Sequence, residues 1–240
     1  MRVKTVYLKF NREKRGHKIC LDSWLNIFDR YKKVLVTDNL TDPKNIRYID
    51  DICKKHNMEK INTNYSLADP YLGFLDKTWI NAAAVNLTCF KREQEPFWLI
   101  DADDTLFLTK DFDDLKSRFR LAEDYFFNNN LDAFSLDFYR ELASDHWSFG
   151  VTLINPLIDL SKLQKVARSD AENRRLICNL DSAFDCLRIK REYRLKSFIF
   201  DRCFFQHHAD NPRYLPYGVY YWENRSLWGH TPIREDVISI

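Results

Sequence analysis

Glycine is scarce in this sequence, and the few glycines stand far apart. Only 5 of the 240 residues are Gly, which is roughly 2% against an average near 7%. No two of them form a closely spaced pair. The chain therefore lacks the P-loop and the GxGxxG loop, two glycine-rich loops that cradle nucleotide phosphates.

Closely spaced cysteines and long apolar runs are also absent. The 6 cysteines form no CxxC pair, so a zinc site has no support, and each is expected to be a buried reduced thiol. No apolar run approaches the ~18 residues that a membrane span needs, and the apolar stretch near Met1 is too short for a signal peptide. We therefore expect a cytoplasmic protein that starts at Met1, and peripheral contact with the inner membrane is compatible with this sequence.

A strong excess of one charge is missing too. Lys and Arg number 37 and Asp and Glu 35, so the formal net charge is +2. A dedicated nucleic-acid binder is usually much more basic, so we expect no nucleic-acid partner. The hydrophobic content of 45%, with 15% aromatic residues, excludes a disordered chain and allows a sizeable core.

Short apolar runs alternate with amphipathic segments along the first half of the chain. The predicted strands are residues 5–10, 34–36, 61–64 and 97–100, and the predicted helices between them are residues 17–28, 45–56 and 77–91. Because parallel strands need crossover connections, this alternation predicts an α/β fold with a mainly parallel central sheet flanked by helices.

The second half is less regular. It predicts a helix at 112–128, strands at 132–138 and 150–154, a helix at 178–190 and a late strand in the apolar run 198–205. No internal repeat or linker interrupts the chain, so we expect a single domain over residues 1–240 with an elaborated C-terminal part. The aromatic tail, residues 214–228, suits an acceptor groove, a protein interface or a membrane-proximal patch alike.

Three carboxylates follow the predicted strand at 97–100. Asp101, Asp103 and Asp104 lie within four residues, where mutual repulsion raises at least one pKa unless a cation or strong donors compensate. Mg²⁺ and Mn²⁺ bind carboxylate oxygens and leave positions open for phosphates. Ligands in parallel α/β sheets bind beyond the carboxyl ends of strands, so this cluster predicts a divalent-metal site, with a polar turn as the plain alternative.

The segment FWLIDADDTLFL, residues 97–108, resembles the DxD motif of the GT-A fold, nucleotide-sugar-dependent glycosyltransferases. Further segments resemble that family in the same order: FNREK at 10–14, VLVTDN at 34–39, FGVTLIN at 149–155, NLDSAF at 179–184 and FFQHH at 204–208. The resemblance covers about residues 3–210. It implies a Rossmann-like domain with its nucleotide-sugar-binding half at 1–110 and its acceptor-side half at 111–240.

The resemblance also implies roles for individual residues. Those implied to bind Mn²⁺ or Mg²⁺ are Asp101, Asp103, Asp104 and His207, with His208 as the alternative to His207. Those implied to contact the nucleotide are Phe10, Asn11, Arg12, Asp38, Asp101 and Asp103. Asp181 either caps a helix or lies near the reacting sugar as acceptor support or base. The implied reaction transfers a sugar from a nucleotide-sugar donor to a glycan, lipid-linked or protein acceptor.

Two other interpretations remain open. The haloacid-dehalogenase-like phosphatases also begin with an apolar strand and DxDxT, which would make Asp101 a nucleophile and Asp103 an acid/base. In that family the motif usually opens the fold, and Ser135 here is followed by no GDxxxD-type motif. A GT-A-like domain that binds nucleotide or glycan without catalysis is the second interpretation.

Overall fold

The computed structural model describes most of the first 136 residues and parts of the remainder. The described residues are 2–10, 15–38, 42–63, 80–103, 105–107, 111–136, 150–159, 192–200, 205–207 and 237–240. Four helices lie within them: α1 (Arg15–Ile27), α2 (Pro43–Lys55), α3 (Ile80–Arg92) and α4 (Phe112–Asn128). The strands are β1 (Thr5–Lys9), β2 (Lys32–Asp38), β3 (Glu59–Thr63), β4 (Phe97–Asp101), β5 (Thr105–Phe107), β6 (Ala133–Leu136), β7 (Val151–Ile154), β8 (Leu195–Ile199), β9 (Phe205–His207) and β10 (Val237–Ser239).

Eight of these strands form one sheet, in the order β10-β8-β6-β7-β4-β1-β2-β3. Only β7 runs against its neighbours, since it is antiparallel to both β4 and β6, and the other five pairs are parallel. The two remaining described strands, β5 and β9, form a separate antiparallel pair. The predicted fold class, an α/β protein with a mainly parallel central sheet flanked by helices, is confirmed.

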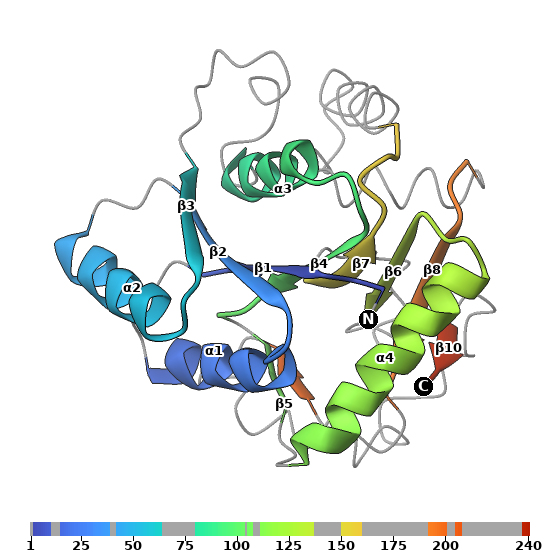
Figure 1. Ribbon diagram of the computed structural model, residues 1–240, viewed down its shortest axis with the longest axis horizontal. Helices are drawn as coiled ribbons and strands as arrows, with labels where there is room; N and C mark the ends of the chain where they lie inside the picture. Colours follow the sequence, from blue (N-terminus) through green and yellow to red (C-terminus); the bar gives the residue numbers. More distant parts are fainter. Residues whose placement is uncertain are drawn as a thin grey trace, which may run out of the picture.

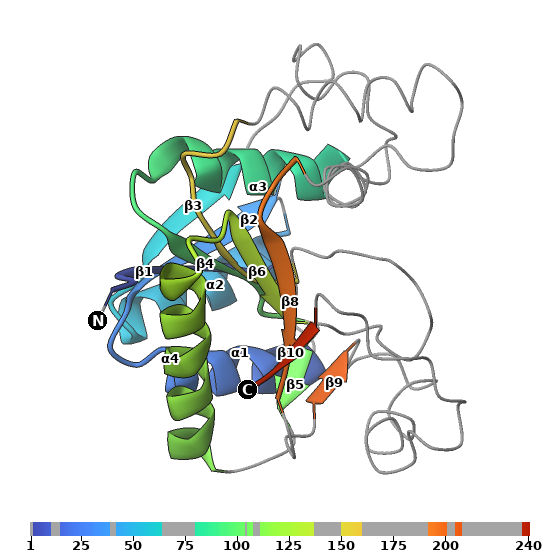
Figure 2. The ribbon, with the colours of Figure 1, turned by 90° about the vertical axis from the view of Figure 1, so that its right-hand side faces the viewer.

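Helices cover the sheet unequally. In Figure 1, α1, α2 and α4 lie below the sheet and α3 lies above the part made by β1, β2 and β3. Figure 2, turned by 90°, shows the same separation, with α3 across the sheet from α1 and α4. Because successive side chains of a strand point to opposite faces, each strand supplies one set of side chains to the α1 and α4 layer and the other set to the α3 layer.

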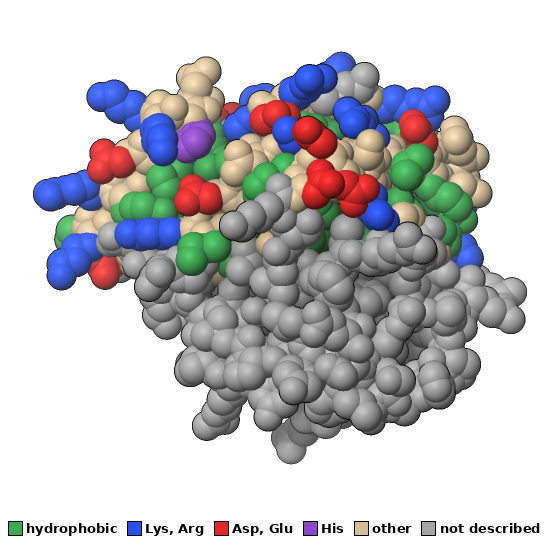
Figure 3. Space-filling view, turned by 90° about the horizontal axis from the view of Figure 1, so that it is seen from below, with side chains coloured by type: hydrophobic (Ala, Val, Ile, Leu, Met, Phe, Trp, Pro, Cys, Tyr) green, Lys and Arg blue, Asp and Glu red, His purple; other side chains and the backbone are tan. Residues whose placement is uncertain are grey.

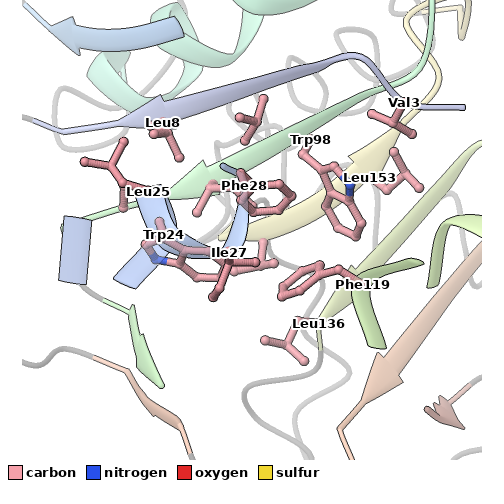
Figure 4. Close-up of a cluster of buried hydrophobic side chains, with 14 of the residues drawn as sticks. Val3, Leu8, Trp24, Leu25, Ile27, Phe28, Trp98, Phe119, Leu136 and Leu153 are labelled. Carbon is pink, nitrogen blue, oxygen red and sulfur yellow. The ribbon is translucent and has the colours of Figure 1, made fainter. Parts of the chain in front are cut away.

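The hydrophobic core lies between the sheet and the α1 and α4 layer. Trp24 of α1, Phe28 directly after this helix, Trp98 of β4 and Phe119 of α4 are fully or almost fully buried and converge in Figure 4. The ring centroids of Trp98 and Phe119 are 5.1 Å apart in an edge-to-face arrangement. Such aromatic pairs add about 0.5–1.5 kcal/mol beyond the burial of area, so this layer fixes the position of β4, the strand that precedes the acidic cluster.

Most predicted elements of the first half agree with the observed ones to within three residues. The predicted helix at 178–190 lies outside the described residues, and so do residues 137 and 138 of the predicted strand at 132–138. The apolar run 198–205, which Asp201 and Arg202 interrupt, contributes to two strands: β8 of the large sheet ends at Ile199, and Phe205 begins β9 of the small sheet. The sequence predicted neither β5 nor β10.

Three of the cysteines that were predicted to be buried thiols lie within the described residues. Cys20, Cys53 and Cys89 are buried and form no disulfide, as predicted, whereas the other cysteines lie outside the described residues. No helix in the described ranges is both long enough and apolar enough to cross a lipid bilayer. Seen from below in Figure 3, basic and acidic side chains are interspersed on the described surface.

Candidate active site

The acidic cluster begins at the carboxyl end of β4, near the middle of the sheet. Asp101 is the last residue of this strand, and its amide donates a 2.6 Å hydrogen bond to the carbonyl of Gly150, just before β7. The amide of Ala102 donates a 2.9 Å bond to the carbonyl of Lys9 in β1. The main chain that leads into Asp103 is therefore tied to the strands on both sides of β4.

The cluster is also anchored on its far side. Phe107 of β5 is almost fully buried, and its ring centroid lies 5.1 Å from that of Trp24 and 6.1 Å from that of Phe119. Both partners belong to the core layer. The acidic segment thus runs between two elements, β4 and β5, that the core holds in place.

Parallel pairing brings several predicted nucleotide-binding positions to the same edge of the sheet. Asp38 ends β2 and Phe10 directly follows β1, the strand between β2 and β4. The Phe10 ring is fully buried and packs against Tyr48 with centroids 6.0 Å apart. The ring is therefore not exposed for stacking on a ligand in this structure, and the predicted nucleotide contact of Phe10 stays a prediction. Asn11 and Arg12 lie outside the described residues.

His207 belongs to the small sheet that follows the cluster. The register of β5 and β9 sets the Cα of His207 opposite that of Thr105, two residues after Asp103, and Figure 2 shows the two strands side by side. Positions more than 100 residues apart in sequence thus meet beside the acidic cluster. The predicted site residues Asp104 and Asp181 and the alternative ligand His208 lie outside the described residues.

Two residues of the candidate site, Lys9 and Asn86, were not predicted from the sequence. Lys9 in β1 stands opposite Asp101 in the β1–β4 register, and its Nζ lies 2.5 Å from Asp101 Oδ1. The same ammonium donates to Oδ1 of Asn86 in α3 at 3.4 Å. The one available signal was a lysine in the otherwise apolar strand TVYLKF, at a position that faces the α3 layer.

Cys89 lies in the same helix as Asn86 but offers no ligand. Burial raises the pKa of its thiol to about 12, and the nearby positive charge of Lys9 offsets this only in part. Since the thiolate is the form that binds metals and attacks electrophiles, Cys89 stays protonated and inert near neutral pH.

The chemistry of the donors fits a hard divalent cation. Asp101 and Asp103 supply carboxylate oxygens, which Mg²⁺ and Mn²⁺ prefer. Within the described part of the chain, no group of three His, Cys, Asp or Glu side chains could hold a metal. A complete ligand set would therefore draw on Asp104 or His207, the neighbouring positions named above.

Comparison with known proteins finds similarity to solved structures. No protein family matches this sequence, and no curated protein does. The mannosyltransferase PcManGT from Pyrobaculum calidifontis, solved in complex with GDP-Man and Mn²⁺, is similar to this chain at 17% identity and a TM-score of 0.48. The match covers 81% of this chain and 53% of that structure, so the chain spans about half the length of PcManGT.

Proposed function

We propose that this chain is a metal-dependent glycosyltransferase of the GT-A type, which transfers a sugar from a nucleotide-sugar donor to a glycan, lipid-linked or protein acceptor. The observation that carries the proposal is the pairing of β5 with β9, which aligns His207 with Thr105 next to Asp103. Carboxylates and a late histidine at one sheet edge are the positions that the family resemblance implies for the metal site. The parallel strands β1, β2 and β4 end at this same edge, where α/β sheets bind ligands.

Each part of the site has a role in this proposal. Asp103, together with Asp101 or Asp104 and with His207, would hold Mn²⁺ or Mg²⁺, and such a cation acts as a Lewis acid that stabilises the diphosphate leaving group. Asp38, at the end of β2, would contact the base or ribose. Asp181 would support the acceptor or take its proton. The same assignment makes residues 1–110 the donor-binding half of one domain and residues 111–240 its acceptor-side half.

We expect His207→Ala to weaken Mn²⁺-dependent nucleotide binding by about tenfold or more, in the range typical when a metal-site partner is lost. Isothermal titration calorimetry with UDP, GDP and CMP, with and without Mn²⁺, measures this effect and identifies the donor base. His208→Ala is the matched control, since it removes the adjacent histidine, and should change binding less. Equal binding by wild type and His207→Ala would remove His207 from the site, and metal-independent nucleotide binding would contradict the proposal itself.

The phosphatase interpretation makes a separate prediction. Three strand and helix units, β1–α1, β2–α2 and β3–α3, precede β4, whereas the phosphatase motif usually opens its fold. We therefore expect no hydrolysis of para-nitrophenyl phosphate with Mg²⁺ and no aspartyl adduct trapped by beryllofluoride. Robust hydrolysis that Asp101→Asn abolishes would replace the glycosyltransferase proposal with the phosphatase. Cooperative metal and nucleotide binding without turnover on any donor would instead favour a non-catalytic binding domain.

A further inference from the structure

Lys9 is a cation at a largely buried position beside the candidate site. Its side chain is 13% exposed, against 30% for Asp101. Taking an ammonium out of water costs several kcal/mol unless an opposite charge and hydrogen bonds compensate. A largely buried lysine at the carboxyl end of a central strand therefore requires partners that offset the cost of burying its charge.

Lys9 has such partners. Its Nζ lies 2.5 Å from Asp101 Oδ1, a charge-assisted contact at the short end of the usual range. Asn86, which is buried, accepts a second bond from the same ammonium. The Lys9 carbonyl accepts the amide hydrogen of Ala102. Lys9 therefore holds the end of β4 through its main chain and its side chain together.

The ion pair with Lys9 makes Asp101 a weaker ligand for a divalent cation. An ammonium that already contacts Oδ1 repels a metal ion approaching the same carboxylate, and like-charge repulsion is strong in a half-buried setting. Asp103 lies two residues beyond, outside β4.

We propose that Lys9 is a positioning residue of the candidate site: it neutralises Asp101 and keeps this carboxylate as an anchor of the turn, so that Asp103, and not Asp101, binds the cation. The inference rests on the proposed function, because it concerns which carboxylate faces the metal. It revises the metal role that the family resemblance implies for Asp101.

A double-mutant cycle on Mn²⁺ binding tests the proposal. The free Mn²⁺ signal in electron paramagnetic resonance gives the affinity of the full chain for the metal alone. We expect Asp101→Asn to weaken binding by about tenfold or more, because it leaves an uncompensated ammonium near the cation. We expect Lys9→Met to weaken binding to a similar extent, because the Asp101 carboxylate then loses the ammonium that anchors it. The double variant should be no more than about threefold weaker than either single variant, because the two residues act as a unit and their losses do not add.

The outcomes separate this inference from the proposed function. Wild-type affinity in Lys9→Met together with weak binding in Asp101→Asn would make Asp101 a metal ligand, and unchanged affinity in both single variants would leave Lys9 purely structural; either result overturns the inference alone. Wild type that binds no Mn²⁺, or Asp103→Ala that binds it equally well, would overturn the proposed function and the inference with it. Lys9→Arg should keep wild-type affinity, since it keeps the charge.

Lys33→Met is the matched control for loss of a half-buried lysine. Lys33 lies in β2 and donates to the carbonyls of Phe28, Asp29 and Tyr31 at 3.1–3.3 Å. It stands three positions before Val36, the register partner of Lys9, and so away from the acidic edge. Thermal unfolding of Lys9→Met and Lys33→Met measures how much stability is lost when a half-buried lysine is removed. Only replacement of Lys9 should change the effect of Asp101→Asn on Mn²⁺ affinity.

Discussion

Replacing Asp103 by alanine is expected to weaken Mn²⁺-dependent binding of a nucleoside diphosphate by about 100-fold or more, which corresponds to about 2.8 kcal/mol of binding free energy. We propose that Asp103 binds the cation, because Asp101 is already paired with Lys9, with 2.5 Å between Lys9 Nζ and Asp101 Oδ1. Removing it leaves the metal with too few anionic ligands to hold it against water, and the diphosphate loses its bridging cation. Calorimetric titration of the nucleotide in the presence of Mn²⁺ measures the loss.

The control for this variant is Asp113→Ala. Asp113 lies in the first turn of α4, and its side chain is 98% exposed, so its replacement removes one carboxylate without touching the edge where β4 ends. We expect nucleotide binding in this variant to stay within about twofold of wild type, since exposed charges are screened by salt over about 10 Å. Equal losses in both variants would indicate a nonspecific charge effect, and no loss in Asp103→Ala would remove the acidic cluster from the site.

The first half of the fold could be predicted because each element carries a strong local pattern. β1, β2 and β4 are short apolar runs, and α2 begins at Pro43 after Asp42, whose side chain accepts the Lys44 amide at 2.9 Å. Such caps and apolar periods are visible in sequence without knowledge of tertiary contacts. The same reasoning locates the acidic cluster, because its strand ends where the apolar run ends.

The missed features depend on partners that are distant in sequence. Lys9 and Asp101 are paired by the register of β1 with β4, and no local pattern gives that register. Strands of three residues, such as β5 and β10, are too short to show a period. The burial of the Phe10 ring also depends on the sheet, since alternation along β1 assigns it to the face opposite Lys9, the face that packs in the core. Its predicted nucleotide contact stays a prediction.

Glu123 gives the largest expected effect on stability. It lies in α4 and is 4% exposed, and its Oε1 accepts hydrogen bonds from Trp98 Nε1 at 3.0 Å and from the Tyr31 hydroxyl at 2.7 Å. Glu123→Leu removes the acceptor and leaves the fully buried Trp98 donor unsatisfied. An unsatisfied buried donor costs about 1–3 kcal/mol, and with the lost Tyr31 bond we expect the free energy of unfolding to fall by about 2–4 kcal/mol, as measured by urea denaturation at pH 7.

The pH dependence of Glu123 has a definite sign. Burial is the largest cause that raises the pKa of its carboxyl group, and the hydrogen bonds from Trp98 and Tyr31 offset it only in part. Between the ordinary pKa of about 4.3 and the raised value in the folded state, the native protein binds more protons than the unfolded chain. The contribution of Glu123 to stability is therefore present below about pH 4.3 and is lost as the pH rises through the folded-state pKa.

Glu123→Gln separates the charge from the hydrogen bonds. The amide oxygen of Gln still accepts from Trp98 and Tyr31 but does not titrate, so we expect the unfolding free energy of this variant to decline less than that of wild type between pH 5 and pH 7.5. Asp113→Asn, in the exposed first turn of α4, is the control for a charge change on the same helix and should keep the wild-type slope. If Glu123→Gln keeps that slope as well, another group is responsible for the decline. If Glu123→Leu costs less than about 0.5 kcal/mol, the buried acceptor does not stabilise the layer that supports β4.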